Sequence, residues 1–222
     1  MTESLPMFPL NTVLFPGVSV PLRVFEDRYR ALVHRLLRTE DPAERLFGSV
    51  AIREGYEVGE HGAQSLHRVG CRLQMTEIAP HPDGSFDVVA VGRDRIRLDR
   101  LDTSGPCPTG EVTVLTEDRT GVPDEVTETA RAVFTGYAAM VAEIRGVDPH
   151  PGSLPTDAEY LAWTLAAVAP IPLPDQQAVL EAAGPGERLI LLTDLFRREL
   201  SAMNVIPSLP ATRVARTGWS PN

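Results

Sequence analysis

The sequence predicts an α+β fold in which a β-rich half precedes a helical half. Pro and Gly cut the chain from Leu5 to about Leu115 into short apolar runs, which is typical of short strands joined by turns. After Pro123 the apolar residues recur instead at three- and four-residue steps, which indicates helices. We therefore expect a β domain over residues 1–120, a helical domain over 121–206 and a flexible tail over 207–222.

The β half is expected to contain six or seven short strands. Pro16 and Pro21 cannot donate to a strand ladder, so the first strands should be short or lie at a sheet edge. Asp83-Gly84 favours a hairpin, because this pair readily takes the positive φ that a tight turn requires. After a first apolar run around Leu5, the expected strands are Val18–Val24, Leu46–Ile52, Leu66–Ala79, Phe86–Val91, Asp94–Leu101 and Thr109–Leu115.

One amphipathic helix is expected inside the β half, over Glu26–Arg38, where apolar residues recur on one helical face. The helical half is expected to form a bundle of four helices, and Pro170 must end the second of them. These four helices are expected to begin near Asp124, Thr156, Pro174 and Glu187.

The charged residues exclude several classes of function. All 21 basic residues are arginine, because the chain contains no lysine, so a Schiff-base lysine, a Ser-Lys dyad and a P-loop lysine are absent from it. With 30 acidic residues the net charge is −9, which does not favour binding to nucleic acid or anionic lipid. We see no signal-like leader and no long apolar run, so we expect a cytoplasmic protein without a membrane partner.

Residues that could carry metal or catalytic chemistry are better explained by structural roles. His61, His67, Cys71 and His81 lie close together in the sequence but match no metal-binding spacing. Ser85 and the other serines lack a Gly-x-Ser-x-Gly elbow, and the glycine pairs lack the strand-loop-helix context of a phosphate loop. We therefore expect no metal, no cofactor and no enzymatic activity.

Three arginines alternate along one of the expected strands. Arg93, Arg95 and Arg97 should therefore share one face of the sheet, where they could clamp phosphates or carboxylates. The simpler interpretation is a solvent-exposed face that nearby aspartates balance. We favour the simpler interpretation and keep RNA binding through these arginines as the alternative function.

Three groups of residues form a recognisable pattern. The first is Leu5-Pro6-Met7-Phe8-Pro9-Leu10-Asn11-Thr12-Val13-Leu14-Phe15-Pro16-Gly17, continued by Phe25-Glu26-Asp27-Arg28-Tyr29. The second is Val69-Gly70 and Val91-Gly92 around the Asp83-Gly84 turn, and the third is Leu173-Pro174-Asp175-Gln176-Gln177. Together they resemble the N-terminal LON domain of ATP-dependent Lon proteases over nearly the whole chain.

This resemblance implies a PUA-like β pseudo-barrel with one embedded helix, followed by a helical bundle, as a substrate-recognition region. The sequence stops at Asn222 with neither a Walker A motif nor a Ser-Lys dyad, so we expect a stand-alone bacterial LON-domain protein without ATPase or peptidase activity. The expected function is non-enzymatic protein or peptide binding. The expected partners are unfolded or degron-bearing proteins and Lon-type protease machinery.

The expected contact site is the turn Phe15-Pro16-Gly17-Val18. It places an aromatic and an aliphatic side chain around a rigid proline-glycine pair. These residues either form a peptide-contacting lip or close the barrel with their apolar side chains, and the sequence leaves both interpretations open.

Overall fold

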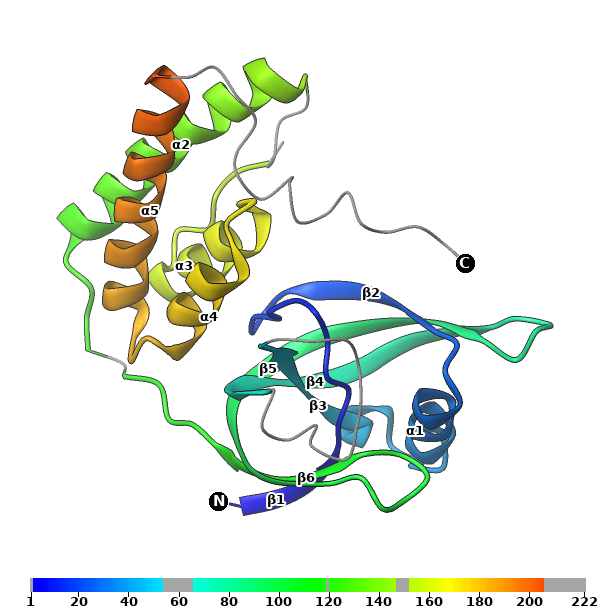
Figure 1. Cartoon of the computed structure of the whole chain (residues 1–222). Coiled ribbons are helices and arrows are strands. Elements are labelled where there is room, and N and C mark those ends of the chain that lie inside the picture. Colours follow the sequence, from blue (N-terminus) through cyan, green and yellow to red (C-terminus); the bar gives the residue numbers. More distant parts are fainter. Residues whose placement is uncertain (1, 54–65, 119, 147–151, 206–222) are drawn as a thin grey trace. The chain divides into compact units, whose positions relative to one another are not determined.

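The computed structural model describes residues 2–53, 66–118, 120–146 and 152–205 (Figure 1). The tail predicted over 207–222, and His61 of the histidine and cysteine set, lie outside the described residues. The chain divides into two compact units, Met1–Thr116 and Glu117–Asn222, which we call the β unit and the helical unit. The described part has an α+β fold in which an antiparallel sheet precedes a helical region.

Within the described residues, the β unit contains six strands and one α-helix. The strands β4 and β5 are long. β5 continues through the positions where two separate strands were predicted. The break predicted around Gly92 is instead a bulge, which adds one residue to β5 without ending its ladder with β4. The elements are β1 (Thr2–Pro6), β2 (Ser19–Val24), α1 (Asp27–Leu37), a 3₁₀ turn (Pro42–Glu44), β3 (Leu46–Ile52), β4 (Leu66–Pro80), β5 (Phe86–Asp102) and β6 (Thr109–Val114).

The sheet has the strand order β1-β6-β5-β4-β3, and β2 pairs with β5 outside this order. Along one edge of β5, its first half pairs with β2 and its second half with β6. Along the other edge, β5 pairs with β4. The predicted pseudo-barrel is not confirmed, because the segment after β1 reaches β3 only through isolated bridges at Met7–Gly48 and Leu10–Ala51.

The helix α1 covers the larger of two apolar clusters in the β unit. Tyr29, Leu32, Val33 and Leu36 are buried, as the helical periodicity of this segment predicted. The Phe8 and Tyr29 rings lie 4.1 Å apart between centroids, so the helix packs on the segment that follows β1. A second cluster, which includes Met7, Ile96 and Val112, lies between β1, β5 and β6.

The helical unit contains α2 (Asp124–Arg145), α3 (Ala158–Val168), α4 (Leu173–Glu181) and α5 (Pro185–Val205). Two predicted boundaries move by a residue or two. Asp157 caps α3 in place of the predicted Thr156, because its carboxylate accepts from the Tyr160 N–H. α5 begins at Pro185, two residues before the predicted Glu187, since proline is well suited to a first helical turn.

The core of the helical unit contains aromatic rings and one buried cation. The Tyr137 and Phe196 rings are stacked at 4.9 Å, which joins α2 to α5. Arg188 is fully buried, and its guanidinium lies 3.8 Å from the centre of the Trp163 ring. None of the helices in the described ranges is both long and apolar enough to cross a membrane.

Candidate functional site

The predicted contact turn lies against β5 rather than projecting from the surface. The Gly17 N–H donates to the Gly92 carbonyl and the Gly92 N–H to the Val18 carbonyl, both at 3.0 Å. Phe15 is only 3% exposed and Pro16 is also buried, whereas Gly17 is exposed and Val18 half-buried. The burial of Phe15 and Pro16 favours the second interpretation, in which their apolar side chains pack inward, and a peptide would meet only Gly17 and Val18 here.

The predicted row of three exposed arginines is also corrected. Arg93 is the extra residue of the β5 bulge, since Gly92 pairs with Leu73 and Asp94 with Arg72. Arg95 pairs with Cys71 on β4 and is only 4% exposed. The exposed Arg97 donates from Nε to the Asp99 carboxylate at 2.8 Å. The three side chains therefore do not form one solvent-exposed cationic surface.

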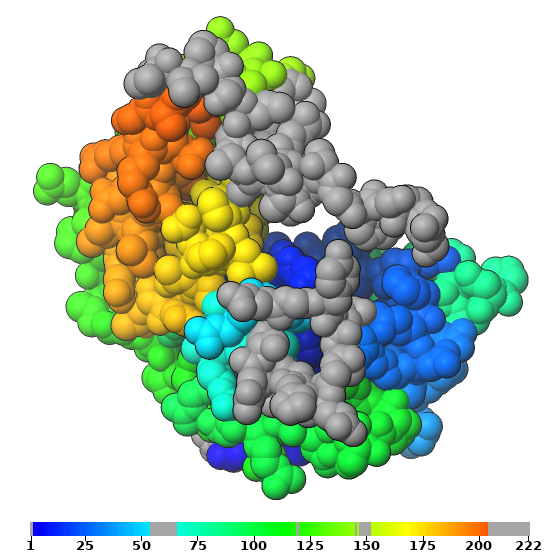
Figure 2. Space-filling model, viewed as in Figure 1, coloured from blue at the N-terminus to red at the C-terminus, as the bar shows by residue number. Residues whose placement is uncertain are grey.

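The structure brings together instead a three-stranded outer face that the sequence did not single out. β2, the start of β5 and the end of β4 lie side by side here, and the β4–β5 hairpin projects from the surface (Figures 1 and 2). The register aligns Pro21 with Val89 and Glu77, and then Arg23 with Asp87 and Ala79. These six residues line an open groove with a volume of about 430 Å³, which we call the outer groove.

The outer groove is apolar in the middle and charged at its rims. Val88 and Ala90 point into the core, so the alternation of side chains places Val89 on the outer face beside Pro21. Glu77 is exposed and makes no ion pair within the described ranges. The other rim carries Arg23 and Asp87, whose Nη1 and Oδ1 atoms lie 2.9 Å apart.

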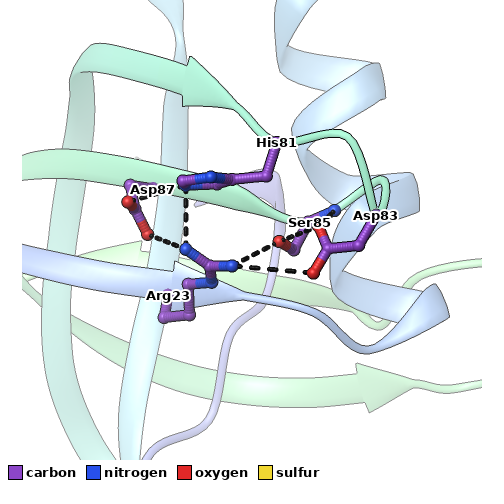
Figure 3. A network of polar contacts seen from close by, with 5 residues as sticks. All are labelled: Arg23, His81, Asp83, Ser85 and Asp87. Atoms are coloured by element: carbon purple, nitrogen blue, oxygen red, sulfur yellow. Dashed lines mark hydrogen bonds and ion pairs between the residues drawn. The ribbon is translucent and has the colours of Figure 1, made fainter.

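A polar network at the hairpin turn holds this second rim in place (Figure 3). Arg23 of β2 donates to Asp87 on β5 and, from Nη2, to the Ser85 hydroxyl at 2.8 Å. The Ser85 hydroxyl donates to the Asp83 carboxylate at 2.5 Å, and the Ser85 N–H donates to the same oxygen. His81 Nε2 lies 2.7 Å from Asp87 Oδ2. The network therefore clamps the hairpin tip to β2.

The network contains Ser, His and Asp side chains but is not a catalytic triad. In a triad the serine hydroxyl is hydrogen-bonded to the histidine, which acts as its base. Here the Ser85 hydroxyl donates to Asp83, and its other close partner is Arg23. His81 contacts Arg23 and Asp87. The arrangement suits a structural clamp.

Hydrogen bonds lower the pKa of two carboxyl groups in this network. The bonds from His81 and then Arg23 hold the pKa of Asp87 below its ordinary value. The hydroxyl and N–H of Ser85 likewise lower the pKa of Asp83. Both carboxylates therefore stay ionised at neutral pH and keep the clamp closed.

We expect Asp87→Asn to unfold at a lower urea concentration than the wild type at pH 7. The folded-state pKa of Asp87 is lowered, so its charge stabilises the fold above the unfolded-state pKa of about 4, and this contribution is lost as the pH falls through the folded value. The difference between the two proteins should therefore shrink at pH 3. An equal difference at both pH values would show that the charge of Asp87 does not matter.

β2 forms one side of the outer groove, and its outward edge pairs with no other strand among the described residues. The Gly92 N–H bonds to the Val18 carbonyl, and backbone hydrogen bonds alternate from there along β2. Val20, Leu22 and Val24 therefore bond to β5, whereas the backbone groups of Ser19, Pro21 and Arg23 face away from it. Pro21 therefore costs no ladder bond inside the sheet. Its missing N–H interrupts the row of donors along the outward edge of β2, which limits aggregation by pairing with strands of other chains.

The remaining sequence candidates stay apart. Among the described residues, no group of three or more His, Cys, Asp or Glu side chains is arranged to hold a metal ion. Cys71 lies on β4 with its side chain buried, and burial raises the pKa of its thiol to about 12. A thiol of this kind is unreactive at neutral pH.

Sequence reasoning missed the outer groove because its residues come from three separate segments. A signal was present in β2, where Ser19, Pro21 and Arg23 occupy the alternate face to the apolar residues. The partners of this face, Val89 and Glu77, are known only once the register of β5 with its neighbours is known.

Comparison with known proteins identifies relatives for most of the chain. The family model of the ATP-dependent protease La (LON) substrate-binding domain matches residues 4–198. The Lon protease of Xanthomonas oryzae pv. oryzae is 27% identical over 212 residues, which cover 90% of this chain and 24% of that protein. The Lon protease of Escherichia coli K12 is 26% identical over 204 residues, 90% of this chain and 25% of that protein. The chain thus spans about a quarter of the length of these relatives.

Two solved structures share the fold. One is a Lon N-terminal domain protein from Xanthomonas campestris, with a TM-score of 0.63 and 24% identity over 86% of this chain and 98% of that chain. The other is the N-terminal domain of the Mycobacterium avium complex Lon protease, with a TM-score of 0.62 and 17% identity over 88% of this chain and 98% of that chain. At these identities the similarity establishes the fold.

Proposed function

We propose that this chain, which belongs to the family of LON substrate-binding domains, binds extended segments of unfolded or degron-bearing proteins in the outer groove. The family match over residues 4–198 confirms the resemblance that the sequence suggested. The relatives are whole Lon proteases of about four times this length, so their ATPase and peptidase activities are not part of the proposal. A Lon-type protease is the natural recipient of a client held in this way.

The observation that carries the proposal is an apolar groove beside an unpaired strand edge. A peptide strand added along β2 would bond to the outward groups of Ser19 and Arg23, and an apolar side chain from it would pack on Pro21 and reach across it towards Val89. Pro21 supplies a carbonyl but no N–H, so the added strand would make an incomplete ladder. Weak and sequence-tolerant binding is the expected result, which suits the recognition of many clients.

We expect Val89→Glu to weaken binding of fluorescent peptides tiled over unfolded casein by roughly tenfold, the loss typical when a central interface contact is removed. The matched control is Val18→Glu, which makes the same change at the half-buried residue of the contact turn. Amide spectra of both variants would establish that each is folded, and fluorescence anisotropy would give the affinities.

A loss confined to Val89→Glu supports the outer groove. A loss confined to Val18→Glu would move the site to Gly17 and Val18, and no loss in either variant would overturn both locations. Binding in the outer groove should also persist as salt is raised, because apolar contacts are not screened by ions.

RNA binding has less support as the alternative. It rested on Arg93, Arg95 and Arg97 as one exposed row, and Arg95 is buried. Arg93 donates to Gln74 on β4, and Arg97 is paired with Asp99. A steep loss of RNA affinity with salt, together with amide shifts at Arg93 and Arg97, would be needed to restore it.

A further inference from the structure

A second pocket of the β unit is lined by basic side chains. It lies between the last turns of α1 and the loop from β5 to β6, and its volume is about 390 Å³. α1 contributes His34 and Arg35, Arg38 follows directly after the helix, and the loop side contributes Gly105 and Thr109. Among the residues that the structure describes, no Asp or Glu side chain lines it. We call it the basic pocket.

The cations of the basic pocket differ from most arginines of the β unit in their partners. Arg23, Arg28 and Arg72, for example, are each paired with a carboxylate. Within the residues that the structure describes, Arg35 donates only to the Thr109 hydroxyl, at 3.2 Å, and Arg38 has no side-chain hydrogen bond or ion pair. Their positive charge is therefore available to a ligand.

The helix dipole favours this arrangement. Cations in the last turn of a helix are favoured by its partial negative charge, and His34 and Arg35 occupy that turn. The same partial charge disfavours carboxylates at this end of the helix, so the dipole also favours a lining without acidic side chains. Three basic side chains line this pocket in a chain with 30 acidic and 21 basic residues.

We propose that the basic pocket binds the phosphate group of a small phosphate monoester. Two guanidinium groups present forked N–H donors that match phosphate oxygens. The Thr109 hydroxyl accepts from Arg35, so its own hydrogen is free to donate to the ligand. The volume is in the range of small-molecule sites, which leaves room for the ester's organic part. This site is separate from the outer groove and does not depend on the function proposed for it.

The space around Gly105 is consistent with a ligand site. A Cβ added at Gly105 would meet a single neighbouring atom within 4 Å, the Cys107 carbonyl oxygen at 3.6 Å. A side chain at this position would therefore enter open space beside the basic side chains. This makes Gly105 a position from which the pocket can be blocked without disturbing the fold.

The test is a titration of the full chain with O-phosphoserine, followed by amide chemical shifts, with serine as the probe that lacks phosphate. We expect saturable shifts at Arg35, Arg38 and Gly105 with O-phosphoserine alone. Arg38→Gln should weaken binding roughly tenfold, because it removes a charge-assisted contact. Arg93→Gln makes the same change on an exposed β5 residue outside the pocket and should leave the affinity unchanged.

A second pair of variants tests the pocket itself. Gly105→Asp should abolish binding, because its carboxylate is tethered beside the arginines, whereas Gly105→Asn of nearly the same size should retain most of it. Equal shifts with serine, a response that does not saturate, or equal losses in Arg38→Gln and Arg93→Gln would each overturn the proposal. Binding of a phosphoserine peptide but not of O-phosphoserine would also overturn it, since the ligand would then be a protein segment.

Discussion

Arg188→Ala is expected to lower the free energy of unfolding of the helical unit by about 3–5 kcal/mol, the usual cost of breaking a buried ion pair. Arg188 has no exposed surface, and its Nη2 donates to the Glu117 carboxylate at 2.6 Å and to the Ala182 carbonyl at 3.0 Å. Its guanidinium also covers the Trp163 ring. One side chain thus joins the segment before α2 to α3 and to the end of α4.

Urea unfolding followed by tryptophan fluorescence and circular dichroism would measure this loss. The matched control is Arg197→Ala on the same helix, whose side chain is 56% exposed and lies 3.7 Å from Asp194. We expect it to cost about 0.5 kcal/mol or less, as exposed pairs do. A double variant, Arg188→Met with Glu117→Gln, should recover part of the stability, because it removes both charges and fills the space. Similar losses in Arg188→Ala and Arg197→Ala would contradict the role assigned to the buried pair.

Gly92→Ala is the second change with a large expected effect, a loss of about 2–4 kcal/mol in the free energy of unfolding of the β unit. A Cβ at this position would lie 2.1 Å from the Phe15 carbonyl oxygen and 3.1 Å from the Cys71 sulfur. A backbone oxygen cannot move away as a side chain can, so the contact turn must separate from β5. The hydrogen bonds of Gly92 to Gly17 and Val18 would then be lost.

Gly105→Ala provides the matched control, because its nearest neighbour is 3.6 Å away, in ordinary contact. We expect a change of about 0.5 kcal/mol or less for it. Hydrogen exchange gives a local measurement beside global unfolding, since the Gly17 amide should lose protection in Gly92→Ala and keep it in the control. Retained protection at Gly17 in Gly92→Ala would show that the turn does not depend on this close approach.

Local patterns predicted the elements whose stability depends on near neighbours in the chain. The apolar spacing of the segment that became α1 predicted both the helix and the face that it buries, because that period places Tyr29, Leu32 and Leu36 on one side. The Asp83-Gly84 turn was also predicted correctly, and Gly84 has a φ of 79°. Pro170 marked the end of α3 two residues after Val168.

The sequence by itself therefore determined the α+β class, the embedded helix, the hairpin and the family, because these depend on periodicity, turn chemistry and long matching segments. Only the tertiary structure decided which side chains reach the surface. A one-residue bulge in β5 and the burial of Arg95 remove the predicted arginine row. The close approach permitted by Gly92 buries Phe15, and the pairing of β2 with β5 places Pro21 beside Val89. Each of these outcomes depends on strand register between distant segments, and a shift of one residue in register would exchange the two faces of a strand.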